Sequence, residues 1–426
     1  RIQCIGKQGG CDIPANATSY DFSNHFITPG LIDAHVHFGQ TGWLDGRPES
    51  LKPNDIYSYP DVVAYARSHP ERWHKSYLCS GITAVYDVGG QSWTVTDKQA
   101  TDTDRPDRAR VRATGPLTTY LSDLNRFYAL SDGTSPVFLP MDTDEQVRAN
   151  VAHIKEIGGA AVKVWFLAPP EGRERELAQR LMLLGKLAKE AGLPMIVHAT
   201  ELQQAKAALR AGVQMLVHSV DDKPVDDEFI ELLLANKTFY APTLGVSGQW
   251  RRAVLSIALQ QAIRIDDPNG CVDDVLLEQI NHPERLTPYL TRQRDLTAAL
   301  DLMQDTGFEL AIMSQNLIRV HKAGGQVLMA TDAGNPLTLH GPSVYWEMEA
   351  MQKAGLSPMD IIVAATLNGA KVMQLDDDIG TLEVGKMADL LVLTKDPSKD
   401  VSHFRSLSHV MRKGVLKSQQ ALRVRN

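Results

Sequence analysis

The sequence predicts an α/β fold built on a parallel sheet, and three observations predict it. Short apolar, β-rich runs alternate with amphipathic segments, which is typical of βα units. The chain has 426 residues, enough for one large barrel and a smaller module. After Leu375 the alternation stops, and short strand-like runs follow one another. We therefore expect a TIM-like (β/α)8 barrel with a small β-sandwich module formed from both chain ends.

The strands of this barrel are expected at eight β-rich runs: residues 31–38, 82–88, 110–116, 160–167, 194–198, 215–219, 238–244 and 327–332. Amphipathic helices are expected between most of them, for example at 173–191, 202–211 and 226–236. A helical segment that begins near "LSPMDII" is expected to close the barrel. Ser357 is its predicted N-cap and Pro358 its first helical residue.

The expected domain boundaries follow from the same pattern. Residues 29–376 form the barrel, and residues 1–28 and 377–426 together form the β-sandwich module. Two connections are longer than a barrel needs, namely the polar and aromatic stretch 117–142 and the mainly helical stretch 245–320. Both are expected to rise from the carboxyl face of the barrel and to shape substrate choice.

Composition excludes some classes of partner. A formal charge of −7 and a pI near 6.0 argue against nucleic-acid binding. We expect no membrane association, because no apolar run approaches the roughly 18 residues that a spanning helix needs. The chain is expected to be soluble, either cytoplasmic or exported after removal of a segment before Arg1. Cys4 and Cys11 flank a predicted hairpin, and both a disulfide and free thiols remain open there.

Polar residues that could take part in chemistry lie in or at the ends of predicted strands. In "GLIDAHVHFG" alternation places Asp33, His35 and His37 on one face of the strand, opposite Ile32, Ala34 and Val36. His198, His218 and Asp332 end later predicted strands, so they would project into the same barrel mouth. A divalent metal would satisfy all of these polar groups together. Other histidines lie on helical or charged stretches and are expected to be solvated: His69, His74, His153, His282, His321, His403 and His409.

Lys163 is surrounded by apolar neighbours in the predicted fourth strand, "GAAVKVWFL". Desolvation favours the neutral amine, which can take up carbon dioxide as a metal-bridging carbamate. The alternative is a lysine that extends its ammonium to the barrel mouth. Its five companion ligands favour the carbamate.

At this point the chain resembles the amidohydrolase superfamily. "PGLIDAHVH", Lys163, His198, His218 and "TDAG" at Asp332 match the binuclear metal pattern in order, and "GTLEVGKMADLLVL" matches the C-terminal β-module. The twenty residues between His198 and His218, together with "FYAPTL", resemble the branch with metal-dependent dipeptidases, carboxypeptidases and imidazolonepropionase-like proteins.

This resemblance implies a ligand set and a reaction. His35, His37 and Asp332 would bind one divalent ion, zinc by expectation, His198 and His218 a second, and carbamylated Lys163 would bridge them. Asp33 would not bind a metal itself but would support the residues that do. A metal-bridging hydroxide would attack an amide, dipeptide or N-acyl amino acid, and Asp332 would pass the proton to the leaving group.

Two further site residues are expected with less support from the pattern. Tyr240, near the end of the predicted seventh strand, would hydrogen-bond the oxyanion or else pack. His340 would line the substrate pocket or else cap a loop. The stretch "GPLTTYLSD" lacks the Gly-Gly-His that peptidase-like relatives carry, so ureas, cyclic amides or lactones stay open as substrates.

Two rival functions remain. "HATE" resembles the His-x-x-Glu of a mononuclear deaminase, in which Glu201 would shuttle protons. A scaffold without activity is disfavoured because all six ligands are present. The expected partner is a small amide or peptide-like substrate, and a homo-oligomer is possible.

Overall fold

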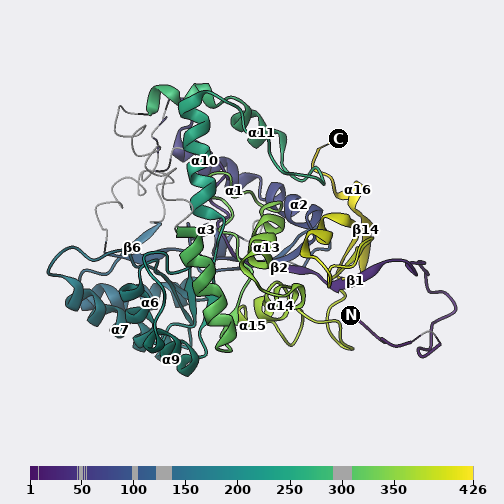
Figure 1. The fold of residues 1–426 in the computed structure, drawn as a ribbon, viewed down its shortest axis with the longest axis horizontal. Coiled ribbons are helices and arrows are strands. Elements are labelled where there is room, and N and C mark those ends of the chain that lie inside the picture. Colours follow the sequence, from purple (N-terminus) through teal and green to yellow (C-terminus); the bar gives the residue numbers. More distant parts are fainter. Residues whose placement is uncertain are drawn as a thin grey trace.

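The computed structural model describes residues 1–7, 9–45, 47, 51, 53, 55–97, 104–120, 137–290 and 309–425 (Figure 1). Its strands are β1 (Phe26–Pro29), β2 (Leu31–Val36), β3 (Ile82–Asp87), β4 (Arg110–Ala113), β5 (Leu117–Thr119), β6 (Phe138–Pro140), β7 (Val162–Trp165), β8 (Met195–His198), β9 (Met215–Val217), β10 (Phe239–Ala241), β11 (Gln326–Val327), β12 (Leu390–Leu393), β13 (Leu407–Arg412) and β14 (Val415–Ser418). Seven of the eight predicted β-rich runs contain a strand, and the eighth, 327–332, shares only Val327 with β11.

The strands from β2 to β11 pair in parallel. In the described part of the chain they form a 3-stranded sheet, β2-β3-β4, and a 7-stranded sheet, β11-β10-β9-β8-β7-β5-β6. Strands that follow one another in the chain are mostly neighbours, as expected for successive βα units. The predicted parallel α/β architecture is therefore confirmed.

Backbone hydrogen bonds also join the two parallel sheets at two places. Ala160 N donates to Ala113 O at 2.8 Å, beside β4 and β7. On the other side, Ala34 N donates to Met329 O at 3.1 Å and His37 N to Ala333 O at 2.8 Å. One cluster of buried apolar residues, which we call the inner cluster, contains side chains of β2, β3, β8, β9, β10 and the segment after β11.

Helices cover the outside of the parallel strands (Figure 1). They are α1 (Tyr59–Ser68), α2 (Glu71–Cys79), α3 (Trp93–Thr96), α6 (Asp144–Ile157), α7 (Glu174–Glu190), α8 (Leu202–Arg210), α9 (Asp227–Asn236), α10 (Val246–Leu259), α11 (Asp274–Asn281), α13 (Ser343–Ala354), α14 (Pro358–Ala364), α15 (Leu367–Val372) and α16 (Gln419–Leu422), with 3-10 helices η2 (Pro283–Tyr289) and η3 (Val401–Ser406).

The helix predictions are confirmed to within a residue or two for α7, α8 and α9. Ser357 caps α14 as predicted, with its side chain accepting from Asp360 N, and Pro358 is the first helical residue. The predicted closing segment is two short helices rather than one, because α14 ends at Ala364 and α15 begins at Leu367.

The chain ends meet in one antiparallel sheet of order β1-β12-β13-β14, in which Phe26 pairs with Leu393. Among the described residues it is a single layer, so the second layer of a sandwich is not seen there. The described residues before β1 contain no strand and extend from the body (Figure 1). Ile2 and Gly385 are joined by a 2.9 Å backbone hydrogen bond.

Two disulfides are present. Cys4 pairs with Cys11, which settles the open alternative at that hairpin. Cys79, at the end of α2, pairs with Cys271, just before α11. The second bond ties the long connection after β10 to the helix layer, and the spacing of the cysteines gave no sign of it.

The two long connections are partly described. The stretch 117–142 begins with β5 and ends with β6, and residues 121–136 lie outside the described residues. The stretch 245–320 contains α10, α11, η2 and helical residues from 309 onward, while residues 291–308 lie outside the description. Its predicted helical character is confirmed where the structure describes it.

One histidine prediction is wrong. His74 is fully buried in α2, where its ring lies 5.5 Å from that of Phe38. The helical face of α2 packs inward at this position, so His74 is part of the core.

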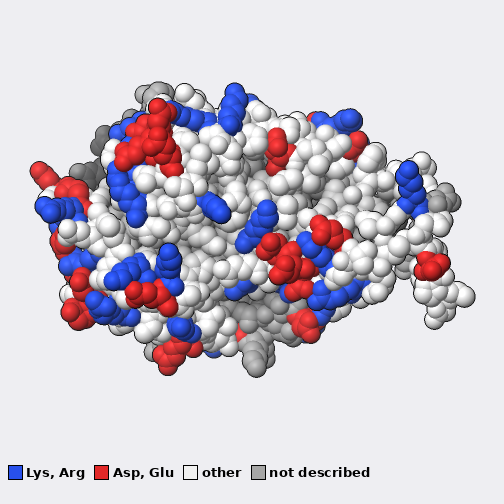
Figure 2. Space-filling view, turned by 90° about the horizontal axis from the view of Figure 1, so that it is seen from below, with Lys and Arg blue, Asp and Glu red and all other residues white. Residues whose placement is uncertain are grey.

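Two surface features bear on partners. No helix in the described ranges is long and apolar enough to cross a membrane. On the face drawn in Figure 2, Lys and Arg are interspersed with Asp and Glu in small clusters. That face presents no basic stripe, which agrees with the acidic composition of the whole chain.

Candidate metal centre

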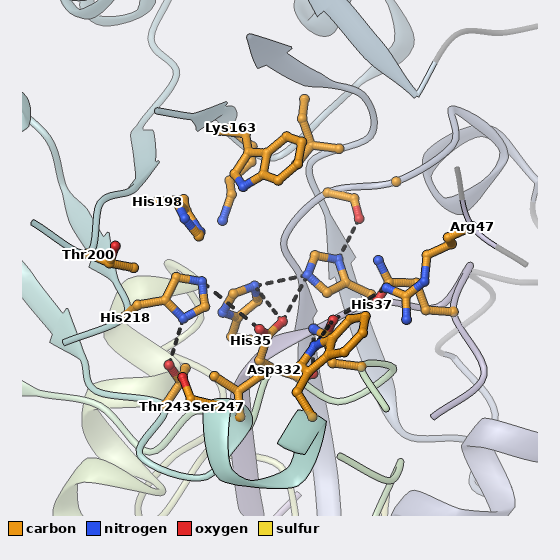
Figure 3. A pocket seen from close by; sticks show the side chains of 18 of the residues that line it. His35, His37, Arg47, Lys163, His198, Thr200, His218, Thr243, Ser247 and Asp332 are labelled. Carbon is orange, nitrogen blue, oxygen red and sulfur yellow. Dashed lines mark hydrogen bonds and ion pairs between the residues drawn. The ribbon is translucent and has the colours of Figure 1, made fainter. Parts of the chain in front are cut away.

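A single cavity of about 480 Å³ is lined by all six side chains predicted to bind metal (Figure 3). They are His35, His37, Lys163, His198, His218 and Asp332. They lie in, or directly after, β2, β7, β8 and β9, and in the segment that follows β11. Because parallel strands end at the same edge, residues far apart in the sequence meet here.

Three of these side chains, His35, His37 and Asp332, form what we call the His35 group. Their Nε2 atoms and Oδ1 approach one another closely: His35 Nε2 is 3.1 Å from His37 Nε2 and 3.3 Å from Asp332 Oδ1. His37 Nε2 is 3.0 Å from the same oxygen. All three residues are buried, so the three donor atoms point at one dry position.

The other three, Lys163, His198 and His218, form what we call the Lys163 group. The rings of His198 and His218 are 4.4 Å apart between centroids and nearly perpendicular. His218 Nε2 is 4.0 Å from Asp332 Oδ2, which links the two groups. The Lys163 group is looser than the His35 group, because no hydrogen bond joins its three members.

Partners on the far side of the rings fix which nitrogen faces the cavity. His37 Nδ1 is 2.7 Å from Gly89 O, and His218 Nδ1 is 2.7 Å from Thr243 Oγ1. In both rings Nε2 is therefore left for a ligand. His35 Nδ1 is buried and has no such partner, and the ring is held by contacts with His37 and His218.

Asp33 supports the site through the backbone. Its carboxylate accepts from His35 N at 3.2 Å, from Thr331 N at 3.0 Å and from Thr331 Oγ1 at 2.5 Å. It thereby joins β2 to the residue before Asp332. Burial raises the pKa of Asp33 to about 7, with the hydrogen bonds from Thr331 and His35 acting against it.

The simple alternation predicted for β2 is wrong. Ile32 and Ala34 belong to the inner cluster, whereas Val36 belongs to a second, separate cluster of buried apolar residues. The pairing of β2 with β3 shifts register between Asp33 and Val36, and Asp33 does not line the cavity. This irregularity turns His35 and His37 toward the cavity while Asp33 stays behind them.

Burial favours the neutral form of three imidazoles, those of His35, His198 and His218. It lowers the pKa of His35 and of His198 well below the usual value, and that of His218 to about 4. Burial alone would raise the pKa of Asp332, but the neighbouring histidines hold it well below its usual value. Near neutral pH the cavity therefore offers uncharged nitrogen donors and one carboxylate.

Lys163 has no hydrogen bond or ion pair for its ammonium among the described residues, although it is only 2% exposed. Burial lowers its pKa to about 7, while Asp332 and Asp87 act in the other direction. A substantial fraction of the side chain is then the neutral amine at neutral pH.

These donors fit a divalent metal. Two ligands bound about 2.1 Å from a tetrahedral ion lie about 3.4 Å apart. The donor atoms of the His35 group are separated by 3.0 to 3.3 Å. Neutral imidazole and carboxylate are ligands that zinc and similar ions accept. The residues of the His35 group are therefore spaced as metal ligands.

Comparison with known families now decides the relationship. The model of the amidohydrolase family matches residues 26–417, from β1 into β14. The chain belongs to the amidohydrolase family. The fold and the positions of its polar strand ends agree with this membership.

Relatives of this amidohydrolase include the imidazolonepropionase of Picrophilus torridus, which is 29% identical over 110 residues. That segment is 26% of this chain and 28% of the relative, so the chain matches only about a quarter of the relative's length. Among solved structures, a Xaa-Pro dipeptidase with bound methionine has a TM-score of 0.65 at 22% identity, covering 94% of this chain and 90% of that one. Molinate hydrolase has a TM-score of 0.67 at 20% identity, covering 100% and 90%. At these identities the two structures show likeness of fold.

Two of the six residues predicted to bind metal adopt a backbone conformation with positive φ. The φ of His218 is 75° and that of Asp332 is 63°. Thr243, the hydrogen-bond partner of His218, has a φ of 44°. Such conformations disfavour L-residues with a Cβ, so the surrounding hydrogen bonds must hold them in place.

Tyr240 is not brought to the cavity. Phe239 and Ala241 belong to the inner cluster of apolar residues, so alternation along β10 turns Tyr240 outward, where it is fully buried. Its hydroxyl accepts from Val220 N at 3.3 Å, and burial raises its pKa to about 12. This geometry disagrees with the expected contact to an oxyanion.

His340 is also absent from the cavity wall. It stacks on Trp73 at 4.1 Å, and its Nδ1 and Nε2 are bound by Tyr77 Oη and Gln40 O at 2.5 and 2.8 Å. Burial lowers its pKa to about 3. His340 therefore joins α2 to the loop after β2, and it is not a pocket residue.

Glu201 does not line the cavity either. It is exposed at the N-cap of α8, although its near neighbour Thr200 lines the cavity. The carboxylate that a deaminase would need at this position is therefore turned to solvent.

Sequence reasoning missed much of the cavity wall. Arg47 and Gln91 follow β2 and β3, while Val246 and Trp250 come from α10. The helical stretch 245–320 was expected to influence substrates, but its amphipathic pattern did not reveal which face covers the cavity. Thr243 and Asp221 were detectable in principle, because Thr243 lies near the end of the predicted strand 238–244 and Asp221 follows shortly after the predicted strand 215–219.

Proposed function

We propose that this amidohydrolase is a metal-dependent hydrolase that cleaves a C–N acyl bond, in an amide, a dipeptide or an N-acyl amino acid. One observation carries the proposal: six side chains of the expected types converge on one cavity. His35, His37 and Asp332 would hold one ion, and His198 and His218 the second. Lys163, as a carbamate, would bridge them.

A pair of divalent ions held there supplies a Lewis acid for the substrate carbonyl and lowers the pKa of the attacking water. The chain contributes the remaining functions. His37 and His218 are oriented by Gly89 and Thr243, so no reorganisation is needed when substrate binds. Asp332 Oδ2, near His218, is placed to accept a proton and pass it to the leaving nitrogen.

The domain organisation forms part of the proposal. The hydrogen bonds that join the two parallel sheets, beside β4 and β7 and again between β2 and the segment after β11, support a closed barrel over residues 29–376. The pairing of β1 with β12 supports a module made from residues 1–28 and 377–426. The carboxyl mouth of such a barrel is where the six side chains lie.

The activities named for similar proteins support a C–N bond as the target. A Xaa-Pro dipeptidase and molinate hydrolase have this fold, and the curated relatives are imidazolonepropionases. The last name makes hydrolysis of a cyclic amide the second candidate. The exposed position of Glu201 disfavours the deaminase.

A substrate panel on zinc-loaded protein tests the proposal. N-acyl amino acids, dipeptides, ureas, lactones and imidazolonepropionate would be compared, with metal content measured by atomic emission. Turnover of an amide with about two metal ions per chain is expected. Ammonia release from aminopurines or aminopyrimidines alone, with one ion per chain, would overturn the proposal.

The two disulfides support an oxidising compartment as the working environment. Thiol titration of the purified protein should then detect no free cysteine before reduction and four after it. Free Cys79 and Cys271 in active protein would contradict this assignment.

A further inference from the structure

Four charged residues line the cavity besides the six proposed metal ligands: Arg47, Asp221, Arg251 and Glu309. Three of them are paired within the protein. Arg47 Nε donates to Asp45 Oδ1 at 2.8 Å, and Arg251 forms an ion pair with Glu309. The carboxylate of Asp221 has no ion pair and no side-chain partner in the described ranges.

The backbone around Asp221 is fixed. Asp221 N donates to Thr200 O at 2.9 Å, which joins the loops after β8 and β9. The preceding residue, Val220, is held on both sides, by Tyr240 Oη at 3.3 Å and by Asn316 Nδ2 at 2.9 Å. The outward position of Tyr240 thus has a structural consequence, because it anchors the loop that presents Asp221.

Asp221 is partly buried, and its surroundings are unfavourable for a negative charge. Burial raises its pKa to about 7, and the carboxylates of Glu309 and Asp222 act in the same direction. Holding an unpaired carboxylate in such a place costs free energy, which a bound cation would offset. A rigid acceptor also loses little entropy when a ligand arrives.

The position of Asp221 places the acceptor beside the reacting centre. It follows His218 by three positions, and its amide is bound to the loop that leaves His198. The cavity wall also contains apolar and aromatic side chains, among them Trp165 and Met313, and the Arg251–Glu309 ion pair. A ligand that extends from the Lys163 group toward Asp221 therefore meets a carboxylate that no cation of the described residues neutralises.

We propose that Asp221 is a specificity-determining residue that binds a protonated amine of the substrate. This inference rests on the proposed amide hydrolysis, and it narrows the substrate class to amides that carry a cationic group near the scissile bond. The amine has two possible sources, the free α-amino group of a dipeptide or the end of a basic side chain. Both offer the charged N–H donors that the carboxylate lacks.

Matched substrates test this assignment in wild type and Asp221→Asn. One pair is a dipeptide and its N-acetylated form, and the other is N-acetyl-lysine and N-acetyl-norleucine. One of the two pairs contains the amine that Asp221 binds. For the cationic member of that pair, Asp221→Asn should lower kcat/KM about tenfold or more. For its neutral member, kcat/KM should change less than about threefold. The pair that responds identifies the source of the amine.

A matched control is Glu231→Gln, which removes one negative charge from an exposed position on α9, away from the cavity. It should leave both members of each pair unchanged, which excludes a general effect of net charge. Metal content should be the same in all three proteins, because Asp221 is not among the proposed ligands.

Binding without hydrolysis separates this inference from the proposed function. Calorimetry with hexylamine and hexanol compares a protonated amine with a neutral molecule of the same length, and neither has a bond to hydrolyse. Wild type should bind hexylamine about tenfold more tightly than hexanol, and Asp221→Asn should lose that preference. If no amide is hydrolysed but the preference is present, only the proposed function fails. Equal binding of both probes by wild type, or equal loss for both members of the substrate pairs, overturns the role of Asp221.

Discussion

The His35 group and the Lys163 group differ in how far the protein itself assembles them. In the His35 group, three donor atoms lie 3.0 to 3.3 Å apart and converge on one position. In the Lys163 group, the two imidazole rings are close but no hydrogen bond connects its members, and the ammonium of Lys163 has no partner among the described residues. The comparison teaches that one half of the site is preorganised by the fold, whereas the other half depends on what it binds.

The largest effect is expected from Lys163→Ala. Without a bridging group, the variant should lose the metal of the Lys163 group and about a thousandfold or more in activity, equivalent to about 4 kcal/mol of barrier. Strand β7 keeps its apolar residues, so the thermal midpoint should change little. Atomic emission, turnover and circular dichroism measure the three quantities.

Two further experiments test the same interpretation of Lys163. Lys163→Arg should fail as well, because a guanidinium stays charged and forms no carbamate. A short carboxylic acid at high concentration should restore part of the activity of Lys163→Ala, since it presents two oxygens as a carbamate does. Full metal occupancy with near-normal turnover in Lys163→Ala would refute the bridging carbamate.

The second largest effect is expected from the stepwise removal of metal ions. Under a weak chelator, the ion of the Lys163 group should leave first, with an affinity about ten to a hundred times lower than that of the His35 group. His198→Ala should then retain about one ion per chain, and His37→Ala should bind the first ion more weakly than His198→Ala does. Equal loss of both ions at every chelator concentration would remove the difference between the groups.

A moderate effect is expected outside both groups. Trp250, on α10, lines the cavity, and its Nε1 donates to Asn335 Oδ1 at 3.3 Å. Trp250→Ala should raise KM for an apolar substrate about tenfold and leave the metal content unchanged. Loss of metal with unchanged substrate preference would contradict the expected role of the 245–320 connection.

The smallest effect concerns Glu347, buried in α13. Its carboxylate accepts from Leu244 N at 2.8 Å and Gly245 N at 3.0 Å, and so holds the loop that carries Thr243, the partner of His218. Glu347→Gln leaves one of these N–H groups less well bound and should lower stability by about 1 kcal/mol at pH 5.

The pH dependence of that variant has a defined sign. Burial raises the pKa of Glu347 from 4.5 to about 8. Between these values the folded wild type retains a proton that the unfolded chain releases, so its stability declines as pH rises. Gln cannot titrate, so the stability advantage of wild type at pH 5 should shrink and then reverse as the pH rises to 8. Urea unfolding at both values measures it, and a constant difference would argue against the raised pKa.

The sequence allowed two things to be predicted, the positions of most strands and the meeting of six polar side chains at one cavity, because both depend on local pattern and on the common edge of a parallel sheet. The direction in which individual side chains point was harder to predict. Tyr240 lies on a strand whose neighbours point inward, and His340 is held by Tyr77 and Trp73 of a distant helix. The register shift in β2 and the Cys79–Cys271 bond also depend on contacts between distant segments, which local periodicity does not encode.

The positive φ angles of His218 and Asp332 carry a consequence for attempts to engineer this protein. A left-handed residue with a Cβ costs about 1 kcal/mol relative to glycine or asparagine. A search for thermostable variants that scores folding alone would therefore select replacements at these two positions, and each gain in melting temperature would remove a ligand. Stability and turnover are in direct competition at these two residues, so they should be held constant in any directed-evolution library.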